Sequence, residues 1–484
     1  MAVHLTKARR LAFAASIAAA FAAATPALSA DMETILEKMH EKGLLTDEEY
    51  QEMRSQAREQ RRREALEKAT AEEKAAKAKE EEPSTLKGRF RDNFVFESGD
   101  KQHSISVQGR IHADFRKFDI DSTNANTADT FDIRRAYLGV TGKLYGDWTF
   151  EVTGDLASDS LEYAWVNYKQ SDLFQYRIGA LKMPFSYEEL TSSRLIDFQE
   201  RSLVNALAPG KEQGLMIHGA PTKWMSYAVA MSNGNGKEGD ETNAVVDDKD
   251  ILGRIAMNFA TPAGIADTVL HLGLNYSTGT IPEGAIFAGG PRTEGRGLAH
   301  LTAIPAFDTI SNEVDRERTG LEGILAWGPL KLQAEWVEAN WSGTAVGGID
   351  FDRSIDAYYA AISWLISGEK YADFYSPNGS RNLKPARPFK KGADGWGAWE
   401  LGLRLSRFDA ADFQQGPAGA AAGAIAASAN AKTDAMTLGL KWIPNTNTRV
   451  YLNYVVSEFD RPIAIAGGTA DEEKAITLRS AVFF

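Results

Sequence analysis

HSISVQGRIHADF, residues 103–115, alternates between apolar and polar side chains. Ile105, Ile111 and Phe115 are among the residues on one face, whereas Arg110 and His112 fall on the other. A period of two is typical of a β-strand, because successive side chains of a strand point to opposite sides. The same pattern recurs until the last residue of the chain. It predicts a closed barrel with lipid outside and water inside.

The composition is compatible with a membrane β-barrel and argues against several other classes of protein. The chain has 484 residues, its mean hydropathy is −0.32, and after the N-terminus no apolar run approaches the ~20 residues that a membrane helix needs. The absence of such a run does not argue against a membrane β-barrel, because only every second residue of a barrel strand contacts lipid. The chain has no cysteine, which excludes disulfides and thiolate chemistry. The net charge of −12 argues against a general nucleic-acid binder.

Residues 1–30 have the three parts of a secretory signal peptide. Lys7, Arg9 and Arg10 form a basic region, residues 11–24 are apolar, and residues 25–30 (TPALSA) are the small residues of a cleavage region. We therefore expect these residues to be removed and the mature chain to be exported.

Residues 31–87 predict a polar helical segment before the barrel. Gly43 is placed to end a first helix, and Thr46 with Glu49 makes a capping box that begins a second. Two interpretations of residues 31–82 stay open. One is a periplasmic coiled coil that helps to trimerise the barrels or reaches peptidoglycan, and the other is a solvated helical spacer.

Residues 88–484 contain about sixteen amphipathic segments, an even count within the range of outer-membrane barrels. The segments are residues 103–115, 134–142, 147–156, 161–168, 173–181, 214–220, 225–231, 251–259, 268–276, 319–327, 330–337, 357–365, 398–406, 435–442, 448–456 and 475–484. We therefore predict an all-β, antiparallel transmembrane β-barrel.

The connections between these segments alternate between short periplasmic turns and long outer loops. Two of them depart from the rule. Residues 157–160 are short on the outer side, which a tight turn explains. Residues 367–395 are long on the periplasmic side, which predicts either additional structure or an unrecognised strand.

The chain ends on an amphipathic strand that closes with Phe484. Such an ending is the usual signal read by the outer-membrane barrel-assembly machinery. Together with the signal peptide and the alternation, it favours the lipid of a Gram-negative outer membrane as the location of the barrel.

Arginines fall on the polar side of their strands, and this side must face the lumen. A lipid-facing arginine at mid-membrane costs ~2–4 kcal/mol. Two interpretations are open: the guanidinium groups attract anions into the channel, or they pair with carboxylates as cross-barrel struts. The candidate pore-lining and anion-binding residues are Arg110, Arg134, Arg135, Arg177, Arg404 and Arg479.

The long connection 182–213 is the candidate constriction loop. It mixes apolar anchors such as Phe185 and Phe198 with charges of both signs. We expect it to fold into the lumen, and the alternative is a loop on the rim. Its candidate constriction residues are Glu188, Glu189, Arg194 and Arg201.

Several segments, in this order and spacing, resemble the phosphate-selective porin O and P family over residues 100–484. They are GRIHADF (109–115), RRAYLGVTGKLYGDWTFEVTGDL (134–156), RIGALKMPFS (177–186), WLISGEKY (364–371) and the run from Asn382 to residues 397–406. The resemblance implies a sixteen-stranded, trimeric outer-membrane porin whose arginines lead anions to a constriction formed by the third outer loop. Arg110 matches the family's first-strand arginine, and Arg134 and Arg135 match its paired arginines.

Other positions depart from the family pattern. Thr149 and Glu189 stand where phosphate-specific members carry lysines, and the outer loop 277–318 keeps few arginines, Arg296 among them. The family's acidic constriction position, by contrast, is matched by Glu162. The expected function is passive diffusion of small hydrophilic solutes with a preference for phosphate-like anions. The alternatives are a general or cation-preferring porin, or an envelope tether with the barrel as its anchor. The sequence contains no HExxH or GxSxG motif, so we expect no catalytic, metal or cofactor site.

Overall fold

The chain divides into two compact units, Met1–Thr85 and Leu86–Phe484. The computed structural model describes residues 32–80, 85–90, 93–120, 127–236, 249–282, 290–301, 304, 307–392, 394–414 and 424–484. The expected signal peptide therefore lies outside the described residues. Among those that are described, no helix is long and apolar enough to cross a membrane.

The first unit contains the two expected helices, α2 (Met32–Glu41) and α3 (Asp47–Glu80). Gly43 ends the first with a φ of 66°, a value that glycine adopts without steric cost. The backbone N–H of Thr46 donates to Glu49 Oε2 at 3.0 Å, and the N–H of Glu49 donates to Thr46 Oγ1 at 3.3 Å. The capping box therefore begins α3 where the sequence predicts it.

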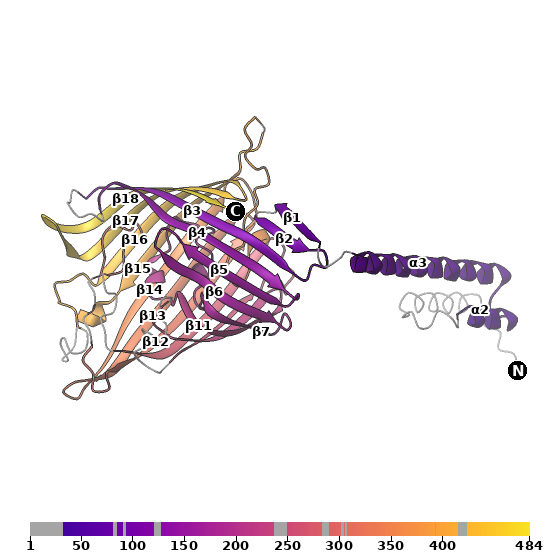
Figure 1. The fold of residues 1–484 in the computed structure, drawn as a ribbon, viewed down its shortest axis with the longest axis horizontal. Helices are drawn as coiled ribbons and strands as arrows, with labels where there is room; N and C mark the ends of the chain where they lie inside the picture. Colours follow the sequence, from indigo (N-terminus) through magenta and orange to yellow (C-terminus); the bar gives the residue numbers. More distant parts are fainter. Residues whose placement is uncertain are drawn as a thin grey trace, which may run out of the picture. The chain divides into compact units, whose positions relative to one another are not determined.

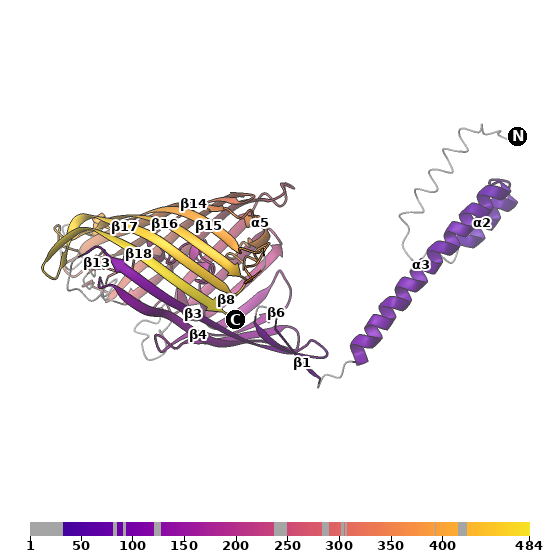
Figure 2. The ribbon, with the colours of Figure 1, turned by 90° about the horizontal axis from the view of Figure 1, so that it is seen from above.

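The second unit is a closed antiparallel β-barrel (Figure 1). Each strand from β3 to β18 pairs with the next, and β18 returns to pair with β3, which closes sixteen strands. Figure 2 shows β18 beside β3 at this seam. The strands are β1 (Leu86–Phe90), β2 (Phe94–Ser98), β3 (Ser104–Phe118), β4 (Thr130–Leu144), β5 (Trp148–Asp155), β6 (Ser160–Lys169), β7 (Gln175–Lys182), β8 (Lys211–Thr222), β9 (Met225–Ser232), β10 (Asp250–Asn258), β11 (Thr268–Pro282), β12 (Glu313–Trp327), β13 (Leu330–Ala345), β14 (Ile349–Leu365), β15 (Ala398–Asp409), β16 (Lys432–Asn445), β17 (Thr448–Ile465) and β18 (Gly468–Phe483).

Each predicted segment overlaps one strand from β3 to β18, so the expected strand count is confirmed. The alternation also holds in space. In β11, for example, Leu270 and Leu272 are exposed on the outer surface, whereas the intervening His271 is buried inside. Outward apolar side chains of this kind form the lipid-facing surface of a membrane barrel.

Two strands were not predicted. β1 and β2 form a hairpin, and β2 pairs with β3 at the residues beyond the end of β18. Phe94 lies opposite Val107, while the N–H of Phe484 donates to the carbonyl of Gly109 at 3.1 Å. The hairpin thus continues the line of β18 along the same edge of β3.

The two irregular connections have simple explanations. Residues 156–159 form a tight turn between β5 and β6. Residues 367–395 add no strand to the barrel; in their described part they contain the short helix α5 (Tyr371–Phe374). Tyr371 and Leu383 of this connection are buried against residues of the barrel wall such as Val269. Additional structure, rather than an unrecognised strand, accounts for its length.

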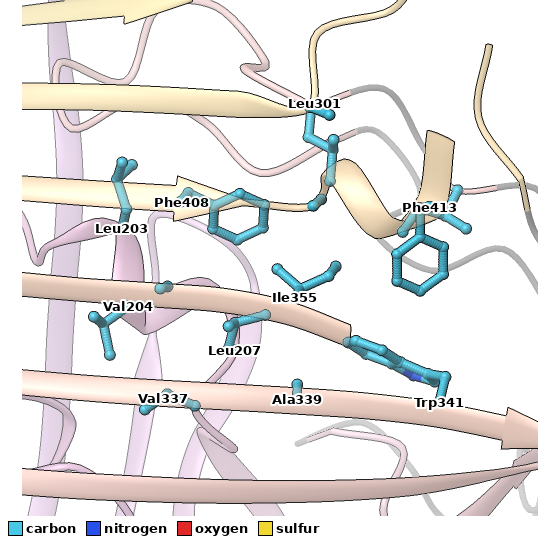
Figure 3. Close-up of a cluster of buried hydrophobic side chains, with 14 of the residues drawn as sticks. Leu203, Val204, Leu207, Leu301, Val337, Ala339, Trp341, Ile355, Phe408 and Phe413 are labelled. Carbon is cyan, nitrogen blue, oxygen red and sulfur yellow. The ribbon is translucent and has the colours of Figure 1, made fainter. Parts of the chain in front are cut away.

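The hydrophobic core lies inside the barrel and not between layers of sheet (Figure 3). Loop residues that fold inward meet the inner faces of β13, β14 and β15, and an apolar side chain buried in this way contributes about 1.5–3 kcal/mol. The labelled members are Leu203, Val204, Leu207, Leu301, Val337, Ala339, Trp341, Ile355, Phe408 and Phe413. One wall of the barrel is therefore packed with protein.

Candidate functional site

The connection between β7 and β8 lies inside the barrel rather than on its rim. It contains the helical turns α4 (Tyr187–Leu190) and η2 (Leu203–Ala206). Glu335 of β13 anchors its first part by accepting hydrogen bonds from Ser186 Oγ at 2.6 Å and from the N–H of Glu188 at 2.7 Å. Further along, Asp197 accepts from Lys331 Nζ at 2.6 Å. We call this connection the first lumen loop.

Arg404 and Arg479 bind carboxylates of the lumen instead of facing open space. Arg404 donates to Glu294 Oε2 at 2.6 Å and to Glu188 Oε1 at 3.0 Å. Arg479 donates to Asp114 at 2.7 and 2.8 Å and to Glu200 Oε1 at 2.6 Å. Both side chains are 1% exposed. They pair with carboxylates, as in the second of the two interpretations, but the partners lie in lumen loops and on the adjacent strand β3 rather than on an opposite wall.

A second connection, between β11 and β12, also enters the lumen. Its Thr293 Oγ1 donates to Glu473 Oε1 at 2.5 Å, and the N–H of Leu298 donates to Glu473 Oε2 at 2.5 Å. Glu294 of the same connection is the partner of Arg404. The expectation that residues 277–318 form an outer loop is wrong for their described inner part, which lies inside the barrel and which we call the second lumen loop. The buried apolar residue Leu301 is the sequence feature that could have indicated an inward position, because the first lumen loop carries similar apolar anchors.

The long connection 367–395 enters from the opposite end and meets the first lumen loop. The N–H of Ser380 donates to Thr191 Oγ1 at 3.1 Å, and the hydroxyls of Tyr187 and Ser380 lie 3.3 Å apart. Arg254 of β10 donates to the carbonyl of Pro377 at 2.8 Å. This connection therefore contacts the first lumen loop from the end of the barrel that carries the short turns.

Replacing Gly379 with valine should displace this support. Gly379 has a φ of +103°, and a Cβ there would lie 2.9 Å from the backbone nitrogen of Thr191. Beyond the strain of a side chain at positive φ, we expect this clash to lower the free energy of unfolding by a further ~1–3 kcal/mol, measured by urea titration in detergent, with added noise in single-channel currents. Gly368→Val is the matched control, since Gly368 has a φ of +94° but no atom within 4 Å of its Cβ position. Equal effects of both variants would show that backbone strain alone matters.

Open space remains along the wall made by β3 to β6. A cavity of about 560 Å³ is lined by residues that include Arg134, Arg135, Asp155, Glu162 and Arg296. A neighbouring cavity of about 320 Å³ shares Arg134, Arg135 and Arg296 with it. We call these two the outer cavities.

A further cavity lies nearer the end of the barrel that carries the short turns. It has a volume of about 200 Å³, and Arg110, Tyr137, Glu151 and Arg194 are among its lining residues. We call it the inner cavity. Tyr137 also lines the larger outer cavity, so the cavities follow one another along the same wall.

The arginines of these cavities differ in their partners. Arg110 donates to Ser193 Oγ at 2.6 Å and to Ser192 Oγ at 3.2 Å, and its guanidinium lies 4.6 Å from the centre of the Tyr137 ring. Arg135 lies opposite His112 in the β3–β4 pairing. Within the described part of the chain neither arginine has a carboxylate within salt-bridge distance.

The remaining predicted basic residues are held by the protein. Arg134 pairs with Glu200 at 3.1 Å, and Arg201 pairs with Glu189 at 3.1 Å. Arg177 lies with its guanidinium 4.1 Å from the centre of the Trp165 ring. Arg194 lines the inner cavity with its guanidinium 5.4 Å from the Phe483 ring.

Glu200 shows how the arginines act on the first lumen loop. It lies in that loop and not in a spanning strand. Burial alone would raise the pKa of its carboxyl, but Arg134, Arg479 and Arg135 together hold that pKa well below its usual range. The carboxylate is therefore ionised, and it neutralises part of the arginine cluster.

Carboxylates without a cationic partner line the same cavities. Glu151 accepts hydrogen bonds from Gln108 Nε2 at 2.9 Å and from Thr153 Oγ1 at 3.0 Å. Asp155 accepts the N–H groups of Ala136 and Ala157 at 2.9 and 3.0 Å. Among the described residues neither carboxylate forms an ion pair. The path through the cavities thus offers free charge of both signs.

Two positions singled out by the resemblance lie near this path: Glu162, which matches the acidic constriction position, and Thr149, which stands where phosphate-specific members carry a lysine. Glu162 accepts from the Tyr137 hydroxyl at 2.8 Å and binds Lys211. Thr149 lies in β5 between Lys143 of β4 and Asn167 of β6. Lys211 was not among the predicted site residues, because it stands at the first residue of β8, where alternation gives no indication of its partner.

Comparison with known proteins places the chain among porins. A family model for phosphate-selective porin O and P matches residues 105–479. Porin O of Pseudomonas aeruginosa is 26% identical over 416 residues, which cover 79% of this chain and 89% of that protein. Among solved structures, OmpT of Vibrio cholerae aligns with a TM-score of 0.48 at 10% identity, over 79% of this chain and 98% of OmpT. An anion-selective porin from Comamonas acidovorans aligns with a TM-score of 0.46 at 12% identity, over 79% of this chain and 100% of that porin.

Proposed function

The chain belongs to the phosphate-selective porin O and P family, and from this premise we propose that it forms a water-filled outer-membrane channel for small hydrophilic solutes that prefers phosphate-like anions. The family and the fold point to a channel rather than an enzyme. Diffusion through such a channel needs sites that hold an ion only weakly, so that it can leave again.

The observation that carries the proposal is the position of Arg110 and Arg135. They line successive cavities on the open wall of the barrel, and among the described residues neither has a carboxylate within salt-bridge distance. A guanidinium group stays charged at any physiological pH and offers paired donors that match phosphate oxygens. Arg134 and Arg296 add positive charge at the outer cavities.

A reversal potential tests this preference directly. We expect the purified protein in a planar bilayer with a KCl gradient to give a potential of the sign that anion selectivity requires. Adding phosphate should reduce the chloride current through competition for the same arginines. A potential of the opposite sign would contradict the proposal.

Glu151 and Asp155 favour a second candidate function. These carboxylates lack cationic partners among the described residues and face the same path, and Thr149 and Glu189 stand at positions where the resemblance leads us to expect lysines. A general or weakly cation-preferring porin would result if their charge outweighed that of the arginines. For such a porin we expect a reversal potential near zero or of the sign that cation selectivity requires. The same measurement therefore separates an anion-preferring channel from a general or cation-preferring one.

The proposal extends to export, assembly and oligomeric state. We infer that residues 1–30 are a signal peptide and that the assembly machinery reads the last strand through Phe484. A homotrimer is supported by the short wall of the barrel: β5, β7 and β9 have 8 residues each, fewer than the ~9–11 that span a bilayer. Contact with a second subunit would cover such a wall.

Deleting residues 31–82 separates a channel from a tether. We propose that this segment lies in the periplasm, as a spacer or as a coiled coil that reaches peptidoglycan. Because it forms a unit apart from the barrel, we expect the deletion to leave the single-channel conductance within about 20% of the full chain. A loss of conductance with the barrel still folded would contradict the channel assignment of residues 88–484. Loss of envelope attachment alone would support a tether in addition.

A further inference from the structure

The β1–β2 hairpin has one face that is apolar and exposed except for Ser98 at its end, which is buried. Pairing places Gly88 opposite Phe96 and Phe90 opposite Phe94, and directly opposite residues share a face of the sheet. Leu86, Phe90, Phe94 and Phe96 are therefore on one side, with exposed fractions of 68, 60, 51 and 42%. An exposed patch of this kind marks a surface that another apolar partner covers.

The other face of the hairpin is polar. It carries Lys87, Arg89 and Glu97, with Val95 as its one apolar residue, and Arg89 pairs with Glu97 at 3.2 Å. The hairpin is thus amphipathic, with aromatic rings on one side and charges on the other. A protein core would need no charged face, whereas a boundary between lipid and water needs both.

The apolar face continues the lipid-facing surface of the barrel. Phe96 is opposite Ile105 of β3, and the same row of pairs runs through Gly142, Phe150, Val166 and Ile178 of β4 to β7. Ile105, Val166 and Ile178 are exposed on the outer surface of the barrel. Because the row is continuous, the rings of the hairpin point in the same outward direction as these lipid-facing side chains.

The hairpin also lies at the level where aromatic residues gather. The turn between β4 and β5 brings Tyr145 and Trp148 to the surface, and Trp148 contacts Tyr168 and Tyr176 at ring distances of 4.9 and 6.1 Å. Aromatic belts of this kind mark the boundary between membrane and water. On the seam side, the Phe94 ring lies 6.3 Å from the ring of Phe484, which joins the hairpin to the end of the barrel.

We propose that the apolar face of the β1–β2 hairpin binds lipid at the headgroup level of the periplasmic leaflet. The barrel does not need the hairpin for closure, because β18 already pairs with β3. The hairpin instead widens the aromatic belt at the seam and holds the start of the barrel at the membrane surface. This role goes beyond solute passage and does not depend on which ion the channel carries.

Single-cysteine labelling tests the proposal, since the natural chain has no cysteine. The variants Phe90→Cys and Phe96→Cys place an NBD fluorophore on the apolar face, and Lys87→Cys is the matched control on the polar face of the same hairpin. Each labelled full-length protein is reconstituted into phosphatidylcholine vesicles. The fluorescence is then quenched with lipids that carry a nitroxide near the headgroup or near the chain end, and separately with iodide in the buffer.

At positions 90 and 96 we expect quenching by the shallow nitroxide lipid to exceed that at position 87 by at least threefold, with iodide showing the reverse order. Iodide quenching at 90 and 96 equal to that at 87 would overturn the proposal, since both faces would then be in water. Protection from both quenchers, with disulfide cross-linking between copies at position 96, would also overturn it by assigning the face to a second copy. If either phenylalanine variant fails to assemble, Leu86→Cys gives the same readout at the end of β1. Because ion currents are not used, a failure here leaves the channel proposal intact.

Discussion

Replacing Arg404 with alanine should lower the free energy of unfolding by about 3–5 kcal/mol, the range for breaking a buried ion pair. Arg404 joins β15 to both lumen loops, because it binds Glu294 of the second lumen loop, and Glu188 and the carbonyl of Glu200 at 3.1 Å in the first. Its guanidinium also lies 4.6 Å from the centre of the Phe198 ring. Without it, two buried carboxylates lose their common cation, and both loops lose an anchor.

The measurement is the midpoint of urea unfolding in detergent, followed by bilayer recording. We expect a lower midpoint, larger current fluctuations and a higher mean conductance, because the loops no longer hold one position. Arg407→Ala is the matched control on the same strand. Its partner Asp434 is 3.7 Å away and both side chains are exposed, so it should cost less than about 1 kcal/mol. If the two variants unfold alike, the lumen loops do not depend on this network.

The strands of this barrel could be predicted from the sequence because their signal is local. Alternation along a strand such as β11 assigns the outward Leu270 and the inward His271 without reference to any other segment. The inward position of the first lumen loop had a similar local basis in its apolar anchors, of which Phe185 and Phe198 are buried.

The partners of the arginines could not be predicted, because they come from distant segments. Alternation places Arg404 inside, but Glu294 and Glu188 are 110 and 216 residues away along the chain. The same limit applies to Glu473, which holds the second lumen loop from 180 residues away. Which cations remain free for ions, and on which wall, follows only once the loops are packed.

The β1–β2 hairpin shows a different limit. Its strands have 5 residues each, and a run as short as residues 86–90 gives too few positions for a period to be recognised. That its apolar residues face outward can be recognised only from the pairing of Phe96 with Ile105, which continues the outer surface of the barrel.

Reversing the charge of the two cavity-lining arginines Arg110 and Arg135, with Arg110→Glu and Arg135→Glu together, should convert the channel from anion to cation preference. A unit charge about 6 Å from an ion contributes about 3 kcal/mol at an effective dielectric constant of about 20. Water and salt in the lumen reduce this value, since the Debye length is about 10 Å at 0.1 M. Even about 1.4 kcal/mol in total changes the permeability ratio tenfold. We therefore expect the reversal potential to change sign.

The matched control changes the net charge by the same amount on the outer surface. Lys117→Glu with Arg407→Glu alters two exposed residues of β3 and β15, so its reversal potential should stay within error of the natural chain. A change of sign in both double variants would mean that total charge, and not the lumen arginines, sets the selectivity. No change in either would mean that ions avoid the wall of β3 and β4. The cavities lined by Arg110 and Arg135 predict that only the first variant responds, because an ion on that path passes both guanidinium groups in turn.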